Sequence, residues 1–180
     1  APSELRCIGR LDKDTSGLVL FAKNQLSAAR LSRQRESGEL KKEYLALVHH
    51  PFSKETQKGT IRLSMEQIPE DDPDSFDSSG KCITKMRICE EGNGRWAATH
   101  YEAVLQDPFW AVVRCRLETG RTHQIRLHMA SIGHSLFGDP LYGVRDGGTR
   151  AALHAWKLHF LQPMTGEPID LENIRTHMFD

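Results

Sequence analysis

Polar and apolar positions alternate along the middle of the chain and predict a series of β-strands. Residues 82–91, 97–107 and 109–120 follow the period of two that places successive side chains on opposite faces of a strand. The tripeptide Gly-Asn-Gly at 92–94 separates the first two of these segments. Because this is turn chemistry between two alternating runs, it predicts a hairpin-like connection.

Three further segments have the composition of strands. The compact apolar run Leu-Val-Leu-Phe-Ala-Lys at 18–23 predicts a buried strand. Residues 41–50 alternate and then meet Pro51, which predicts a strand that ends at a turn. Residues 151–163 are consistent with a strand or with a passage from helix to strand.

Two segments have apolar residues at helical spacing. Residues 24–38 end in a glycine and predict one helix, and residues 121–133, which also end in a glycine, predict a second. Residues 54–60 are expected to turn, and the acidic, proline-broken stretch 66–80 is expected to be a solvated loop. Strands in runs with two main helices indicate an α+β fold with a mostly antiparallel sheet.

Composition and charge restrict the class of protein only moderately. The chain has 180 residues, enough for one domain, with 38% apolar and 27% charged residues. Its 24 basic and 24 acidic side chains cancel, but residues 114–128 carry four arginines and two histidines against one acid, while residues 66–77 carry six acids and no base. A local basic strip can bind phosphate groups even in a neutral protein.

The four cysteines are widely spaced, and none forms the C-x-x-C pattern of zinc knuckles and redox sites. We therefore expect free thiols in a reducing compartment. No apolar stretch approaches the roughly 20 residues that span a bilayer, and the first residues do not resemble a signal peptide. We accordingly expect a cytoplasmic protein with no membrane partner.

The stretch Arg-Leu-Asp-Lys-Asp-Thr-Ser-Gly at 10–17 has the beginning of a calcium-binding loop. Asp12, Asp14 and Gly17 occupy suitable positions, but position twelve of such a loop, where a bidentate glutamate is needed, is Lys23. Calcium binding is thereby excluded. The stretch could be an ordinary turn, since short polar residues and glycine favour turns, or it could present a carboxylate for chemistry.

The histidines do not form a convincing metal site. His123 and His128 lie five residues apart with no glutamate after the first, so the zinc-protease pattern H-E-x-x-H is missing. The chain also has neither a G-x-S-x-G elbow nor a phosphate-binding loop with a G-K-[ST] ending. We expect no metal and no cofactor, and a metal-dependent hydrolase is disfavoured.

The segment Glu-Thr-Gly-Arg-Thr-His-Gln-Ile-Arg-Leu-His at 118–128 is the second candidate for chemistry. A helix that begins near Thr119 and Gly120, with Arg121 in its first turn, would present backbone N–H groups and a guanidinium to a phosphate or a carboxylate. An exposed cationic helix without a ligand remains the alternative.

Four segments, in order, resemble the motifs of the RluA-type pseudouridine synthases. GRLDKDTSGLVLFAKN at 9–24 and LETGRTHQIRLHMASIGHSLFGDPLYG at 117–143 are similar to the two hallmark motifs of that family. KKEYLALV at 41–48 and ALHAWKLHFLQPMTGE at 152–167 resemble its other two elements. The departures are Ser135 and Gln162, where the family usually has proline and histidine; the resemblance covers about residues 8 to 171.

The resemblance implies the pseudouridine synthase fold in a single catalytic domain over residues 1–180. Family members carry several strands ahead of the first motif, so we expect the N-terminal part of the domain to be missing. The implied reaction is the isomerisation of uridine in RNA, with Asp12 as the catalytic aspartate. Tyr44 matches the tyrosine that stacks against the target base, and Arg121 the arginine that pairs with the aspartate.

The remaining expectations concern the substrate. Arg10, Arg126, His123 and Leu153 are expected to bind it, with Leu153 lining the pocket for uracil. Partners would be ribosomal or transfer RNA, and the protein would be a monomer. A non-catalytic RNA-binding module of the same fold is the alternative function.

Overall fold

The computed structural model describes residues 5–77 and 79–173. Its helices are α1 (Gln25–Ser37) and α2 (Gln124–Ser131), with a short 3-10 helix η1 (Pro73–Ser75). Its strands are β1 (Arg6–Cys7), β2 (Ser16–Gly17), β3 (Phe21–Ala22), β4 (Lys41–His49), β5 (Lys58–Gln67), β6 (Met86–Cys89), β7 (Arg95–Gln106), β8 (Trp110–Leu117), β9 (Leu153–Leu161) and β10 (Pro168–Glu172).

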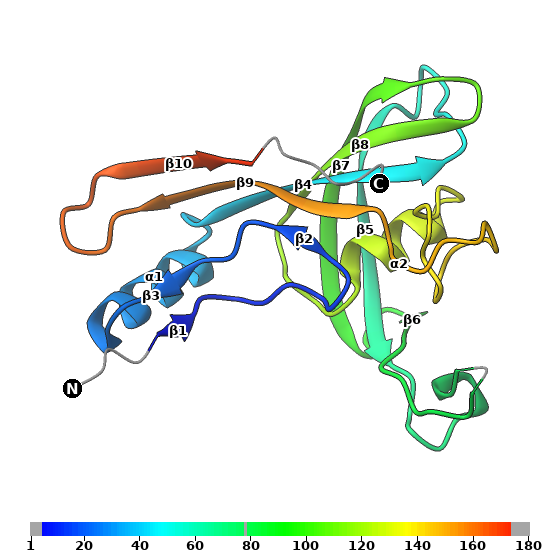
Figure 1. Ribbon diagram of the computed structural model, residues 1–180, viewed down its shortest axis with the longest axis horizontal. Helices are drawn as coiled ribbons and strands as arrows, with labels where there is room; N and C mark the ends of the chain where they lie inside the picture. Colours follow the sequence, from blue (N-terminus) through cyan, green and yellow to red (C-terminus); the bar gives the residue numbers. More distant parts are fainter. Residues whose placement is uncertain (1–4, 78, 174–180) are drawn as a thin grey trace.

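An eight-stranded sheet organises the fold. Seven strands run in the order β10-β9-β4-β8-β7-β5-β6 with antiparallel neighbours, and β2 joins as a parallel partner of β9. β1 and β3 form a separate antiparallel pair, which lies beside α1 below the β9–β10 hairpin (Figure 1). The α+β class with a mostly antiparallel, mixed sheet is therefore confirmed.

The first helix forms where the sequence predicts it. The side chain of Asn24 accepts a hydrogen bond from the Ser27 N–H at 2.8 Å and caps the N-terminus of α1. Gly38 ends the helix in the left-handed conformation, with a φ of 78° that glycine adopts without a steric penalty.

The second helix is shorter than the predicted 121–133. It begins only at Gln124, because His123 adopts a φ of 55° and interrupts the helical backbone. Arg121 therefore lies in an irregular turn ahead of α2 and not in its first turn, contrary to the prediction. This turn is the part of the chain that reaches the candidate site.

The predicted hairpin at Gly-Asn-Gly is wrong, because β5 lies between β6 and β7 in the sheet. The connection at 90–94 instead crosses over the backbone of β5. Gly94 has a φ of 65°, and a Cβ atom there would lie 2.5 Å from the carbonyl oxygen of Met65. Gly94 is therefore needed because two backbones approach closely at this point, and not because the chain makes a hairpin turn.

Two other segments differ from expectation. β5 extends over Lys58–Gln67, where the sequence suggested the end of a turn and the start of a loop. The apolar run 18–23 contains only the two-residue strand β3, and Phe21 remains 52% exposed. Leu18, Leu20 and Ala22 pack in the cluster below α1, so alternate residues of this run are exposed and it is not a fully buried strand.

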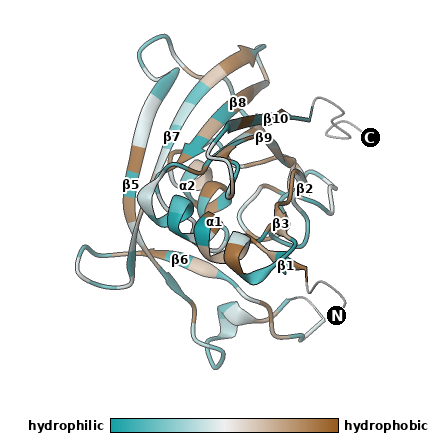
Figure 2. Cartoon of the chain, turned by 90° about the vertical axis from the view of Figure 1, so that its left-hand side faces the viewer, coloured by the Kyte–Doolittle hydropathy of each residue, from teal (hydrophilic) through white to brown (hydrophobic). Residues whose placement is uncertain are grey.

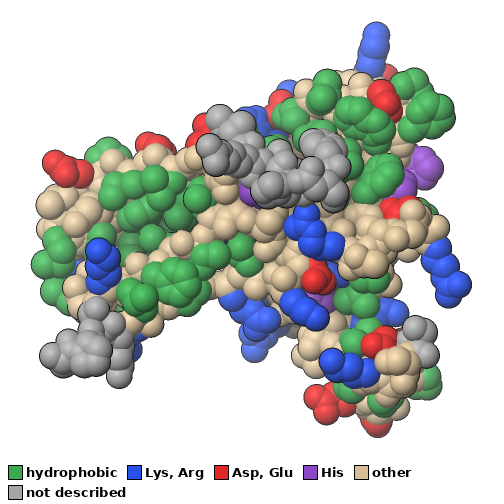
Figure 3. All heavy atoms as spheres, viewed as in Figure 1, with side chains coloured by type: hydrophobic (Ala, Val, Ile, Leu, Met, Phe, Trp, Pro, Cys, Tyr) green, Lys and Arg blue, Asp and Glu red, His purple; other side chains and the backbone are tan. Residues whose placement is uncertain are grey.

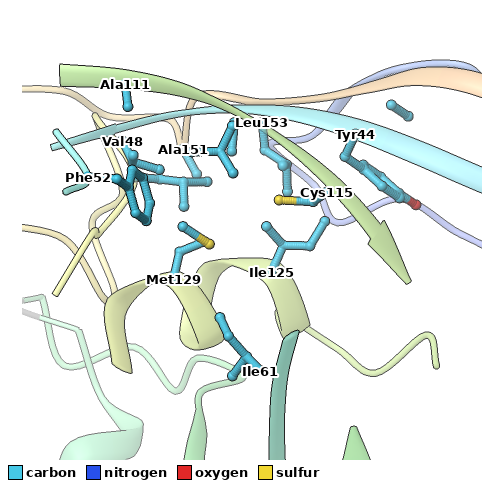
Figure 4. Packing of buried hydrophobic residues seen from close by; sticks show 14 residues of the cluster. Tyr44, Val48, Phe52, Ile61, Ala111, Cys115, Ile125, Met129, Ala151 and Leu153 are labelled. Atoms are coloured by element: carbon cyan, nitrogen blue, oxygen red, sulfur yellow. The ribbon is translucent and has the colours of Figure 1, made fainter. Parts of the chain in front are cut away.

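The main hydrophobic cluster lies between the sheet and α2. Val48 from β4, Val113 from β8 and Met129 from α2 are fully buried in it. Figure 4 shows Tyr44 at one end of this cluster, with its hydroxyl oxygen directed away from Phe52 at the other end. In Figure 2 the helices lie inside the curve of the sheet. The candidate site lies at the end of this cluster that is marked by Tyr44.

Candidate active site

A cavity of about 100 Å³ opens where four segments distant in sequence meet. Its walls come from the turn after β1, from β4, from the turn between β8 and α2, and from the start of β9. The lining residues are Arg10, Leu11, Asp12, Thr15, Tyr44, Leu117, Gly120, Arg121, Thr122, Gln124, Ile125 and Leu153. Five of the seven predicted site residues are among them.

Asp12 sits on a tight turn that is anchored to β9. Its carbonyl oxygen accepts the Thr15 N–H at 2.9 Å, and Ser16 Oγ bonds to His154 Nδ1 at 2.8 Å. Gly17 has a φ of 111°, and a Cβ atom there would lie 2.2 Å from the Ala155 carbonyl oxygen, so only glycine allows this docking. Within the described residues the Asp12 carboxylate makes no hydrogen bond or ion pair, and Asp14 does not line the cavity.

Tyr44 forms the floor of the cavity. Its side chain is buried among the core residues around Cys115 and Ile125. Burial, and second the negative charge of Asp12, raise the pKa of Tyr44 to about 12. The phenol is therefore neutral at physiological pH, and Tyr44 and Asp12 line the same cavity.

Arg121 is held at the rim of the cavity at two points. Its main-chain N–H donates to Gln124 Oε1 at 3.0 Å, and its Nε donates to the Trp96 carbonyl oxygen at 3.1 Å. Its two Nη groups make no hydrogen bond to any residue in the ranges 5–77 and 79–173. No ion pair within 4.0 Å joins it to Asp12 among these residues, so the two groups face one cavity without closing on each other.

Arg126, predicted to bind substrate, is instead buried and does not line the cavity; it is 3% exposed. Its Nε donates to Asp139 Oδ2 at 2.8 Å and its Nη2 to Asp139 Oδ1 at 2.6 Å. Burial by itself lowers the pKa of Arg126, but the hydrogen bonds and charge of Asp139 outweigh it, and the net shift is upward. A guanidinium engaged in this way has a structural role.

His123 lies beside the cavity without lining it. Its Nδ1 bonds to the Tyr142 hydroxyl at 2.9 Å, and the same hydroxyl accepts the Met86 N–H at 2.8 Å. The Tyr142 hydroxyl therefore joins the His123 ring to the backbone of β6 and fixes the orientation of the ring. Burial, and second the charge of Arg126, lower the pKa of His123, so the ring is neutral near pH 7.

The last two predicted residues line the cavity from opposite sides. Arg10 is exposed at the rim, and Leu153 is buried at the start of β9. Figure 3 shows lysine and arginine side chains spread over the visible face and not gathered in one patch. The cavity therefore combines one apolar wall with two arginines at its mouth.

Sequence reasoning missed three residues that shape the site. Gln124 lines the cavity with a fully bonded amide, Asp139 neutralises Arg126, and Tyr142 orients His123. All three lie in the second hallmark segment and match fixed positions of its pattern, in H-Q-I-R, G-D and Y-G, so the motif was the signal that could have found them.

The described residues show neither a group of metal ligands nor a membrane-spanning helix. Within the ranges 5–77 and 79–173, no three histidine, cysteine, aspartate or glutamate side chains are grouped so that they could hold a metal ion. No helix in the same ranges combines the length and apolar character needed to cross a membrane.

Comparisons with known proteins identify the family to which this α+β fold belongs. The profile of the RNA pseudouridylate synthase family matches residues 1–131. The chain therefore belongs to this family, and the resemblance to its RluA-like members is confirmed.

Two relatives illustrate the similarity. The chain is 37% identical over 176 residues to the ribosomal large subunit pseudouridine synthase D of Zymomonas mobilis, a match that covers 92% of this chain and 51% of that protein. It is 38% identical over 185 residues to the uncharacterized RNA pseudouridine synthase YhcT of Bacillus subtilis, covering 95% and 55%. The chain spans about half the length of the curated relatives it matches.

Solved structures share the fold. Human RNA pseudouridylate synthase domain containing 1 superposes with a TM-score of 0.72 at 26% identity, covering 94% of this chain and 68% of that one. Human RNA pseudouridylate synthase domain containing 4 superposes with the same score at 20% identity, a likeness of fold alone.

Proposed function

We propose that this chain is an isomerase that converts uridine in RNA to pseudouridine, with Asp12 as its catalytic carboxylate. The observation that carries the proposal is the cavity where Asp12, Tyr44 and Arg121 meet from three separate segments. Family membership supports the reaction class. Asp12 suits the role because its carboxylate is engaged by no described residue, which leaves both oxygens for substrate.

The reaction rearranges bonds without a redox change. The N1–C1′ bond breaks, C5 bonds to C1′, the hydrogen on C5 leaves to solvent, and N1 gains a proton. A carboxylate can act as the nucleophile or stabilise positive charge that develops at C1′. Arg121 lines the same cavity, and its guanidinium is the proposed partner of negative charge in the transition state.

A uridine in a structured RNA is reached only when its base leaves the stack, so we propose that the target base is flipped into the cavity. Tyr44 offers an aromatic surface there, and stacking on such a surface contributes about 1–3 kcal/mol per base. Leu153 lines the opposite side and excludes water from the base. Burial holds Tyr44 neutral, so its ring does not repel the carboxylate of Asp12.

The substrate proposed is ribosomal RNA of the large subunit, by analogy with the named relatives. Arg10 is exposed at the mouth of the cavity and is the proposed contact for an RNA phosphate. His123 is proposed to form a hydrogen bond with the RNA beside the cavity through its Nε2. Arg126 is left out of this set because its guanidinium is already paired.

The second candidate is an RNA-binding module of the same fold without catalysis. It shares with the first candidate the fold, the cavity and the exposed Arg10 at its mouth. This candidate predicts the same affinity for RNA as the proposed enzyme and the same dependence of that affinity on salt, but no formation of pseudouridine.

The test uses large-subunit ribosomal RNA transcribed with uridine that carries tritium at C5. Because C5 loses its hydrogen in the reaction, tritium released to water counts turnovers, and nuclease digestion identifies pseudouridine. Wild type with EDTA should release tritium, and Asp12→Asn should not. Asp14→Asn is the matched control, since Asp14 lies on the same turn but outside the cavity.

Three results would contradict the proposal. Full activity of Asp12→Asn would remove Asp12 from the mechanism. Loss of activity in EDTA with recovery on adding a metal would point to a different chemistry. Binding of the RNA by wild type without tritium release would support the non-catalytic module.

A further inference from the structure

Gln124 is a buried polar side chain of the second hallmark segment for which the sequence predicted no role. It is 2% exposed at the first position of α2 and lines the cavity. Its Nε2 donates to the Ala98 carbonyl at 2.9 Å and to Thr99 Oγ1 at 3.0 Å. Its Oε1 accepts the Thr119 hydroxyl at 2.8 Å and the Arg121 N–H at 3.0 Å. The amide thus uses its full bonding capacity.

The directions of these bonds are fixed by their neighbours. Thr119 Oγ1 accepts the Ala98 N–H at 3.1 Å, so its own proton goes to Gln124. Thr99 Oγ1 also bonds to His128 Nδ1 at 2.9 Å. One connected set of hydrogen bonds results, and exchanging the oxygen and nitrogen of the Gln124 amide would break the bonds to the Ala98 carbonyl, which can only accept, and to the Arg121 N–H, which can only donate.

These hydrogen bonds connect the turn that carries Arg121 to strand β7. The turn lacks helical structure, and His123 at the start of α2 provides no side-chain cap. Gln124 supplies a restraint, because its Oε1 accepts the Arg121 N–H while its Nε2 donates to the Ala98 carbonyl of β7. The Arg121 Nε is tied to β7 as well, at the Trp96 carbonyl.

We propose that Gln124 is the positioning residue for Arg121: it fixes the main chain of the turn so that the two free Nη groups face Asp12 and the substrate. The proposal rests on the function proposed above. Gln124 would act through Arg121 and would not touch the reacting atoms. A displacement of about 1 Å in such a group can cost about 10²-fold in rate.

Gln34 provides a matched control. It is also a buried glutamine, and its amide bonds to both the N–H and the carbonyl of Leu161 at 2.8 Å. It lies on α1 and does not line the cavity. If buried glutamines matter only for stability, Gln34→Met and Gln124→Met should behave alike.

The first measurement needs no activity. Amide hydrogen exchange should show the Arg121 N–H protected in wild type and in Gln34→Met, and unprotected in Gln124→Met. The second is the single-turnover tritium release with the C5-labelled ribosomal RNA. Gln124→Met should lower the rate by about 10²-fold, while Gln34→Met should leave it within about 2-fold although it lowers the thermal midpoint.

A double-mutant cycle tests whether the effect passes through Arg121. In an Arg121→Lys background, Gln124→Met should lower the remaining rate by less than about 3-fold, because the guanidinium to be positioned is already gone. Equal effects of Gln124→Met in both backgrounds, or unchanged protection of the Arg121 N–H, would overturn the proposal.

Gln124→Glu serves if Gln124→Met does not fold. Its carboxyl keeps the acceptor for the Arg121 N–H, and when protonated it also regains one donor for the Ala98 carbonyl. Its rate relative to wild type should therefore rise as pH falls; a ratio independent of pH would count against positioning. If wild type itself releases no tritium, the proposed function fails, and the exchange data alone decide whether Gln124 restrains Arg121.

Discussion

An aspartate and an arginine are combined in two ways in and around the candidate active site. Asp139 and Arg126 form a buried, bidentate ion pair, which we call the closed pair. Asp12 and Arg121 line one cavity without an ion pair between them, and we call them the open pair. The closed pair is buried and its charges are neutralised, whereas the open one leaves a carboxylate and two Nη groups without a partner among the described residues.

The comparison separates stability from chemistry within a single motif. Asp139 also accepts the main-chain N–H groups of Leu141 and Tyr142 at 2.9 and 3.2 Å, so its carboxylate is saturated. Through these bonds Asp139 holds its own loop and α2 in place. Two arginines only five positions apart therefore differ in role because their partners differ, and not because of their residue type.

The largest expected effect is on the closed pair. Arg126→Met should destabilise the protein by about 3–5 kcal/mol, because it leaves the buried Asp139 carboxylate without its counter-charge. Urea unfolding measures the change. Arg121→Met is the control and should alter stability by less than about 0.5 kcal/mol.

A variant that replaces both partners sharpens this test. Arg126→Met combined with Asp139→Leu should cost less than Arg126→Met alone, since no unpaired charge remains buried. If the double variant were the less stable of the two, the ion pair would contribute more than its desolvation costs.

The second effect is on the open pair and concerns rate. Arg121→Met should lower the single-turnover rate of tritium release by about 10²–10³-fold, the range seen when one group that stabilises developing charge is removed. Arg116→Met is the control, because Arg116 is exposed on β8 and does not line the cavity. Equal rates for both variants would remove Arg121 from the mechanism.

The third effect is a pH dependence of the buried interior. Burial lowers the pKa of His128 to about 4, and its Nε2 has no partner among the described residues. Between about pH 4 and the unfolded value near 6.5, the unfolded chain binds the extra proton, so stability falls as pH is lowered through this window. The loss attributable to His128 should approach about 3 kcal/mol at pH 4.

Urea unfolding at several pH values measures this loss. His128→Leu should flatten the stability profile between pH 4 and 6.5, whereas His159→Gln, a change at a more exposed histidine on β9, should not. An unchanged slope in His128→Leu would assign the pH dependence to other groups.

The smallest effect is on RNA affinity. Arg10→Gln should weaken binding of the ribosomal RNA modestly and reduce the slope of log affinity against log salt by about 1, as expected for one phosphate contact. Arg33→Gln on α1, outside the cavity, should leave the slope as it is. The same slope for Arg10→Gln and wild type would mean that Arg10 does not reach a phosphate.

Much of the local structure could be predicted from the chain. α1 follows from Asn24 and Gly38, and β4 and β8 follow from their alternation. The hairpin at Gly-Asn-Gly failed because turn chemistry does not reveal which strands pair, and β5 enters between its two arms. The same limit hid β5 itself, whose polar residues hold a strand only through the ladders on both sides.

The sequence by itself determined the family, the α+β class and five of the residues that line the cavity. It did so because motifs and periodicity are local properties. Only the tertiary structure decided that Arg126 is paired and Arg121 is open, and that Gln124 bonds both to the Arg121 N–H and to the Ala98 carbonyl of β7. The reason is that burial and bonding partners arise from residues distant in sequence, here Asp139, Trp96 and Ala98.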